Sequence, residues 1–133
     1  MVRHRIWHSV TLLAMDGYRA LDAWQLAQQL CLGVLEATDG PLPRRTWAVV
    51  DQLRRAVVSI DVNIVEGYAL GTVPLLRRHL RIALGSAAEA HRLLTIAADR
   101  GYLPSPRTTA FLHLADRTAA CLFRLLRSPN LRR

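Results

Sequence analysis

The sequence predicts an all-α protein, an antiparallel up-down-up-down four-helix bundle in one domain. Three short segments that combine Gly and Pro interrupt the chain, at 38–43, 67–74 and 100–106, as they do where one helix ends and the next begins. Between these breaks, apolar residues recur at spacings of three and four, which is the period of a helix and not of a strand. Short connections between long helices favour antiparallel neighbours.

Four helices follow from these breaks. They are expected at Asp22–Ala37, Arg45–Glu66, Pro74–Asp99 and Pro106–Leu126. The bundle then spans 18–127, between an N-terminal extension at 1–17, for which disorder is one interpretation, and a basic C-terminal tail at 128–133. The expected core-facing residues are Trp24, Ala27, Cys31, Val34, Val50, Leu53, Val57, Ile60, Ile64, Leu76, Leu80, Ala83, Ala87, Ala90, Leu94, Ala97, Phe111, Ala115, Thr118, Leu122 and Leu125.

Two of the expected helices carry a second apolar stripe. It consists of Val58, Val62 and Val65 on the second helix and of Ile82, Leu93 and Ile96 on the third. One stripe per helix is enough for a bundle core, so helices that are apolar on two sides are usually buried on two sides. Two interpretations are open: self-association into a homo-oligomer, or a three-layer contact within one chain.

The chain is strongly basic. It has 18 basic residues, all of them Arg, against 10 acidic ones, which gives a net charge of +8. A GC-rich coding sequence explains the choice of Arg over Lys, but it does not explain the excess. Such a charge favours RNA, DNA or another polyanion as partner, through contacts to phosphates that need no base-reading motif. The candidate nucleic-acid-binding residues are the clustered ones: Arg44, Arg45, Arg54, Arg55, Arg77, Arg78, Arg81, Arg124 and Arg127.

Polar residues on the second helix favour a structural network over an active site. Gln52, Ser59, Asn63 and Glu66 lie close to one helix face, flanked by Val and Ile. A connected set of this kind fixes the register between helices, and no nucleophile–base pair accompanies it. The sequence also lacks the Glu-x-x-His pairs of a di-iron bundle and any Gly-rich phosphate loop. We therefore expect no catalytic residues, no metal and no cofactor.

The cysteines and the apolar runs favour a cytoplasmic protein. Cys31 and Cys121 lie in apolar stretches without a Cys-x-x-Cys spacing, as free thiols of a reducing compartment do. A bridge between them stays open as an alternative. The longest uncharged run, 23–35, is too short and too rich in Gln to cross a bilayer.

Ordered blocks of residues resemble a known family. They are Tyr18-Arg19-x-Leu21, Trp24-Gln25-x-Ala27, Gln52-Leu53-Arg54-Arg55-Ala56, Ser59-Ile60-x-x-Asn63-Ile64-x-Glu66-Gly67-Tyr68, Leu80-Arg81-Ile82-Ala83-Leu84-Gly85-Ser86-x-x-Glu89 and Gly101-Tyr102-Leu103. Together they are similar to the four-helix-bundle proteins encoded in intervening sequences of 23S ribosomal RNA genes, relatives of the Avd accessory proteins of diversity-generating retroelements.

The resemblance implies a ring-like homopentamer with a basic surface that binds nucleic acid and a reverse transcriptase without catalysis of its own. It adds Ser86 and Glu89 to the polar residues expected in helix packing or subunit contacts. Three departures stand out: Asp61 where relatives commonly carry Pro, Ala69-Leu70-Gly71 where they tend to be basic, and His91 in place of an acidic residue. The alternative function is a protein–protein interaction bundle with no direct nucleic-acid binding.

Overall fold

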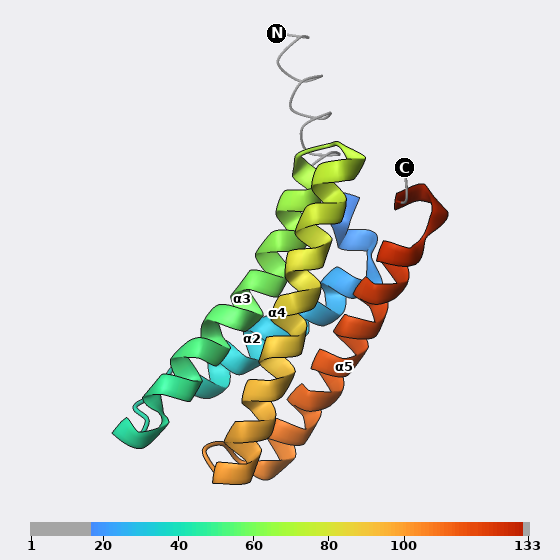
Figure 1. Cartoon of the computed structure of the whole chain (residues 1–133). Coiled ribbons are helices and arrows are strands. Elements are labelled where there is room, and N and C mark those ends of the chain that lie inside the picture. Colours follow the sequence, from blue (N-terminus) through green and yellow to red (C-terminus); the bar gives the residue numbers. More distant parts are fainter. Residues whose placement is uncertain (1–16, 132–133) are drawn as a thin grey trace, which may run out of the picture.

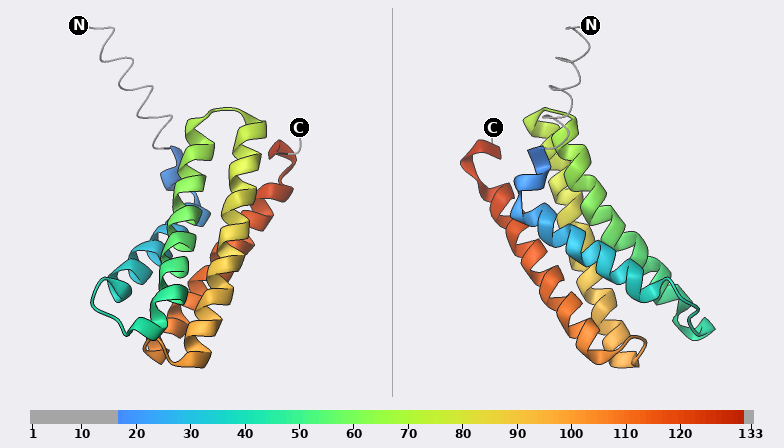
Figure 2. Two further views of the ribbon diagram at one scale, coloured as in Figure 1. Left: turned by 60° about the vertical axis from the view of Figure 1, so that its left-hand side comes forward. Right: turned by 180° about the vertical axis from the view of Figure 1, so that it is seen from behind.

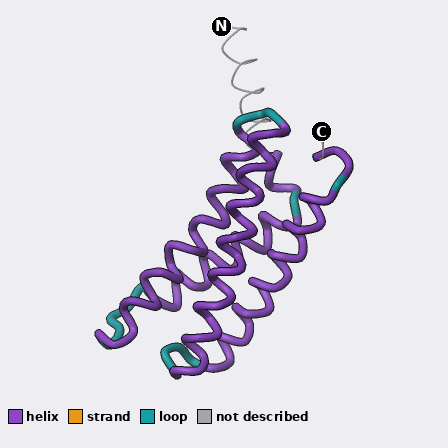
Figure 3. Tube along the Cα trace, in the orientation of Figure 1, coloured by secondary structure: helices purple, strands orange, loops and turns teal. Residues whose placement is uncertain are grey.

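The computed structural model describes residues 17–131, and these residues form helices and connecting loops only (Figures 1 and 3). The long helices are α2 (Asp22–Thr38), α3 (Trp47–Ala69), α4 (Val73–Arg100) and α5 (Ser105–Arg127). Three short 3-10 turns accompany them: η1 (Gly17–Ala20), η2 (Arg44–Thr46) and η3 (Pro129–Leu131). The all-α class with four helices is confirmed. The predicted N-terminal extension lies, apart from Gly17, outside the described residues.

The ends of α4 follow from local chemistry. At its start, the Thr72 side chain accepts a hydrogen bond from the backbone N–H of Leu75, and Pro74 occupies the first turn, where its missing N–H costs nothing. At its end, Gly101 has a φ of 66°, in the left-handed region that glycine adopts without strain. Both ends lie within one residue of the prediction.

The expected bounds of the second helix are wrong at both ends. The segment at Arg45 forms the turn η2, in which the Thr46 hydroxyl donates to the carbonyl of Pro43 at 2.7 Å. At the other end, Gly67 does not break the helix, because α3 continues to Ala69. Gly67 is buried against His79 and Leu76 of α4. There, glycine permits a close approach of two helices instead of ending one.

The four helices enclose one core. α2 packs against α3 and α5, and α4 packs against the same two helices (Figure 2). Contacts between α3 and α4 join early residues of one helix to late residues of the other, such as Gln52 to Glu89 and Asn63 to His79. These two helices therefore run antiparallel.

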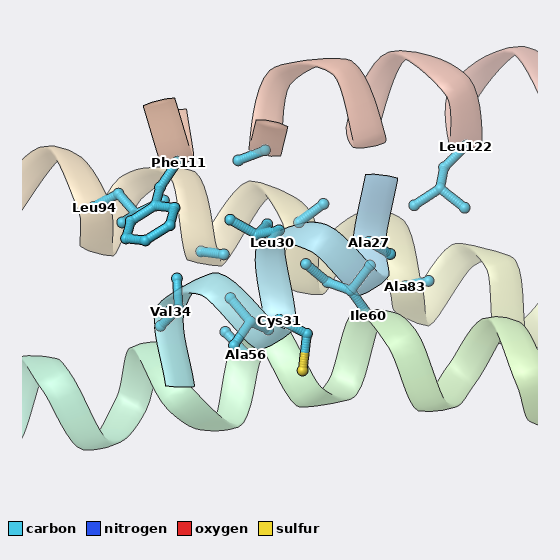
Figure 4. Packing of buried hydrophobic residues seen from close by; sticks show 14 of the residues in the cluster. Ala27, Leu30, Cys31, Val34, Ala56, Ile60, Ala83, Leu94, Phe111 and Leu122 are labelled. Atoms are coloured by element: carbon cyan, nitrogen blue, oxygen red, sulfur yellow. The ribbon is translucent and has the colours of Figure 1, made fainter. Parts of the chain in front are cut away.

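Figure 4 shows part of the core, to which all four helices contribute, with Leu94 and Phe111 packed together at one side, Leu30 and Ile60 in the middle and Leu122 at the other side. The expected core residues of α3 are all buried. On α2 the prediction was wrong about Trp24, which is half-buried because its indole Nε1–H donates to Asp61 at 2.9 Å. The expected core residues Leu76 and Leu125 are also only half-buried.

The second apolar stripe is left uncovered in part. Val58, Val62 and Ile82 keep 38%, 43% and 42% of their surface exposed within the described residues. Val65, Leu93 and Ile96 are half-buried. A three-layer contact among the described elements therefore does not account for the first three residues. We call Val58, Val62 and Ile82 the apolar face.

Candidate nucleic-acid interface

The start of α4 and the end of α5 lie at the same end of the molecule (Figures 1 and 2). Arg77 of α4 donates from Nη1 to the backbone carbonyl of Leu131 at 2.7 Å, and Leu131 is buried against the bundle. The predicted tail thus packs on the bundle as far as residue 131. The fold brings together five of the nine predicted Arg residues, which we call the basic end: Arg77, Arg78, Arg81, Arg124 and Arg127.

Two contacts fix how α4 and α5 are aligned. One is the hydrogen bond from Arg77 to Leu131, and the other joins His91 Nε2 to Asp116 Oδ1 at 3.3 Å. Because α4 and α5 run antiparallel, each step forward along α4 between these two contacts corresponds to a step backward along α5. This alignment places Arg127 across from Arg81, and Phe123 across from Leu84.

The basic end has little acidic compensation. No Asp or Glu occurs at 73–88 of α4 or at 117–131 of α5 and η3. Arg78, Arg81 and Arg127 are exposed and form no ion pair among the described residues. Arg124 donates from Nη2 to Cys121 Sγ at 3.3 Å and shares a surface groove with Asp22, which offsets part of its charge. The guanidinium groups of Arg78, Arg81 and Arg127 are therefore the ones most available to an anionic ligand.

An exposed aromatic side chain lies within the basic end. Phe123 keeps 51% of its surface exposed, and the guanidinium carbon of Arg127 lies 5.4 Å from the centre of its ring. Sequence reasoning missed Phe123. The sequence does contain a signal for an exposed aromatic ring among basic residues, because Phe123 directly follows the core residue Leu122, precedes Arg124 and lies one turn before Arg127.

The other predicted pair, Arg44 and Arg45, lies in η2, and both side chains are exposed. The Arg44 guanidinium carbon is 5.5 Å from the Trp47 ring. The pocket beside Trp47 is also lined by Asp39 and Asp51. The charge of this region is mixed, so it attracts phosphates less than the basic end does.

Arg54 forms hydrogen bonds within the bundle, to residues at the end of α2. Its Nη1 donates to Thr38 Oγ1 at 2.6 Å, to the Leu35 carbonyl at 3.3 Å and to Asp39 Oδ1 at 3.1 Å. These groups lie at the C-terminal end of α2, where carbonyls lack helical partners. Arg54 therefore stabilises a helix end. Arg55, one residue on, is exposed and lines an apolar groove with Val58 and Val62.

The predicted polar residues meet across α3 and α4. Gln52 donates to Glu89, the hydroxyls of Ser59 and Ser86 lie 2.8 Å apart, and Asn63 Nδ2 donates to the Ser59 carbonyl at 2.8 Å. His79 donates from Nδ1 to Asn63 Oδ1 at 2.9 Å, and the same nitrogen lies 3.5 Å from Glu66 Oε2. The residues of this polar seam are Gln52, Ser59, Asn63, Glu66, His79, Ser86 and Glu89.

Both cysteines are free thiols, Cys31 buried and Cys121 half-buried. Burial, with a smaller contribution from the Asp61 carboxylate, raises the pKa of the Cys31 thiol to about 11. Over residues 17–131, no three His, Cys, Asp or Glu side chains are grouped as metal ligands would be. In the same part of the chain, no helix combines the length and apolarity that crossing a bilayer requires.

Comparison with known proteins gives a family. A search of curated proteins found no match. The family model described as "23S rRNA-intervening sequence protein" matches residues 19–124, which include α2, α3, α4 and most of α5. Because this match covers most of the chain, the protein belongs to the 23S rRNA-intervening sequence protein family.

Proposed function

We propose that this protein is a non-enzymatic accessory protein that binds RNA or DNA through phosphates at its basic end. The observation that carries the proposal is the grouping of Arg78, Arg81 and Arg127 on helix ends that contain no acidic residue. All three are exposed and form no ion pair within residues 17–131. The family description names 23S rRNA, which supports RNA as one ligand. The absence of catalysis is supported by the polar seam, whose members bond to one another.

One copy of the basic end would bind weakly. Each phosphate neutralised contributes about 0.7 to 0.9 to the dependence of log K on log salt, so three Arg residues give a slope of about 2 to 3. Several copies held in one assembly would raise the affinity, because later contacts to the same strand become intramolecular. Oligomerisation would therefore turn a weak phosphate contact into stable binding.

The apolar face supports self-association. Val58, Val62 and Ile82 are exposed beside the polar seam, whose hydrogen bonds hold α3 and α4 in one register. A rigid, partly apolar surface of this kind suits an interface between copies. We propose an up-down-up-down bundle that assembles as a homo-oligomer, and the family resemblance implies a ring of five. The free thiols support a reducing, cytoplasmic location.

A second candidate is an interaction bundle whose partner is another protein and which binds no nucleic acid. The apolar groove lined by Leu35, Arg55, Val58 and Val62 favours it. The resemblance to Avd proteins suggests the reverse transcriptase of a diversity-generating retroelement as such a partner. In that case the basic residues would serve solubility and ion pairs with the partner.

The test is mass measurement by light scattering in line with gel filtration. The protein is run alone and with a short structured RNA, at low and at high salt. The proposal predicts a multimer that gains the mass of the RNA at low salt and loses it at high salt. A monomer, or a multimer that ignores RNA at both salt concentrations, would contradict it and favour the second candidate.

A further inference from the structure

We infer that Phe123 is a stacking platform for an unpaired base, so that the basic end prefers single-stranded nucleic acid to duplex. The inference rests on the proposed function and narrows it to a ligand class. It depends on three observations: the exposed aromatic ring of Phe123, the guanidinium group of Arg127 beside it, and the absence of Asp and Glu at 73–88 of α4 and at 117–131 of α5 and η3.

The ring is placed to receive a flat ligand. Phe123 lies two helical turns after Asp116, which contacts His91 of α4, so Phe123 is on the α4 side of α5. Its ring is half exposed, and its described aromatic or cationic neighbour is Arg127 at 5.4 Å. Arg81 lies across from Arg127, one turn along α4 from Arg77, whose bond to Leu131 fixes this end of the helix pair. The guanidinium group of Arg127 therefore lies beside the ring, and Arg81 adds a second positive charge across from Arg127 on α4.

Among the described residues, the Phe123 ring does not hold a loop or a helix end in place, whereas the Trp47 ring does. Trp47 is also 51% exposed, but its indole N–H donates to the carbonyl of Leu42 at 2.9 Å and so closes the connection between α2 and α3. A phenyl ring has no polar group to satisfy. Half of its surface faces solvent, whereas the neighbouring residue Leu122 is fully buried in the core.

A nucleotide matches this surface better than an apolar protein partner does. One nucleotide carries a flat aromatic face and, on the same residue, a phosphate, which are the two groups that an Arg-flanked Phe can bind. In a duplex the bases already stack on one another and cannot reach a ring on a convex helix surface. Unpaired bases in single strands and loops can stack on such a ring.

The experiment measures fluorescence anisotropy with three polyanions: a single-stranded adenosine RNA, an RNA duplex of the same length, and inorganic polyphosphate, which has charge but no bases. Phe123→Leu keeps an apolar side chain but removes the aromatic face, and Phe123→Tyr keeps that face. Leu32→Ala, at an exposed apolar position on α2, is the matched control.

We expect F123L to weaken binding of the single strand about fivefold or more, with F123Y and L32A close to wild type. Polyphosphate binding and the salt slope should not change in F123L, because the number of phosphate contacts is the same. Three results would each overturn the inference and leave phosphate binding standing. They are a wild-type preference for duplex, an unchanged single-strand affinity in F123L, and a loss of polyphosphate binding in F123L equal to its loss of single-strand binding. Failure of the wild type to bind any of the three polyanions would overturn the proposed function as well.

Discussion

Replacing Gly67 by Ala should destabilise the protein, although alanine favours helices. Gly67 lies inside α3, two residues before its last residue, where a glycine costs up to about 1 kcal/mol relative to Ala. An added Cβ would lie 3.0 Å from His79 Cβ and 3.1 Å from Leu76 Cδ1. The first of these atoms is attached directly to the backbone of α4, so rotation of a side chain cannot relieve the overlap.

The magnitude follows from two opposing terms. Forcing an extra carbon into a packed contact costs about 1 to 3 kcal/mol, against a propensity gain of less than about 1 kcal/mol near a helix end. Moving α4 away would also strain the contacts of His79 with Asn63 and Glu66. We expect the free energy of unfolding to fall by about 1 kcal/mol, which lowers Tm by roughly 3 to 5 °C for a chain of this size.

The assay is urea denaturation followed by helical circular dichroism, with Tm as a second readout. Ala110→Gly, at an exposed position inside α5, is the control that measures the helix-propensity difference in this protein, and it should cost about 1 kcal/mol. If G67A were instead more stable than wild type by the amount that A110G loses, the contact between α3 and α4 would not be tight at Gly67.

Three further predictions follow from single contacts. Arg54→Met should lower the free energy of unfolding by about 1 to 3 kcal/mol in urea titrations, because α2 loses its terminal hydrogen bonds, and should leave RNA affinity unchanged. Val62→Asp should reduce the assembly to single chains in light scattering while circular dichroism is preserved; an intact multimer would count against the apolar face as the interface. Burial raises the pKa of Cys31 from 9.0 to about 11, so the unfolded chain releases this proton first and stability should fall between those pH values. Cys31→Ala should lack this part of the pH dependence, and an identical pH profile would contradict the assignment.

The sequence was sufficient to predict the helices and most of the core, because Gly–Pro breaks and three-to-four periodicity are local signals. The prediction was wrong at residues whose structure depends on contacts between helices. Gly67 was read as a helix breaker, but the close approach of α4 keeps it helical. Trp24 was assigned to the core, yet a hydrogen bond to Asp61, 37 residues away, holds it at the edge.

The candidate site was predictable as a set of residues and, coarsely, as a place, because the antiparallel bundle expected from the sequence puts the start of its third helix and the end of its fourth at one end of the molecule. Sequence spacing cannot show which Arg side chains stay exposed there. It also could not separate Arg54, which stabilises the end of α2, from Arg81, which is exposed and has no ion pair in the part of the chain that the structure describes. Phe123 was overlooked because an apolar residue next to the core residue Leu122 looks like part of the same helix face.

The salt dependence of RNA binding tests the central claim most directly. The affinity of a structured RNA is measured over a range of salt for wild type, for Arg81→Gln with Arg127→Gln, and for Arg44→Gln with Arg45→Gln. Each double variant removes two positive charges, so the overall charge is matched. Binding at the basic end predicts that R81Q/R127Q lowers the slope of log K against log salt by about 1.4 to 1.8 per bound chain, while R44Q/R45Q stays close to wild type. Equal losses in both double variants, or a wild-type slope in R81Q/R127Q, would contradict the assignment of the interface to α4 and α5.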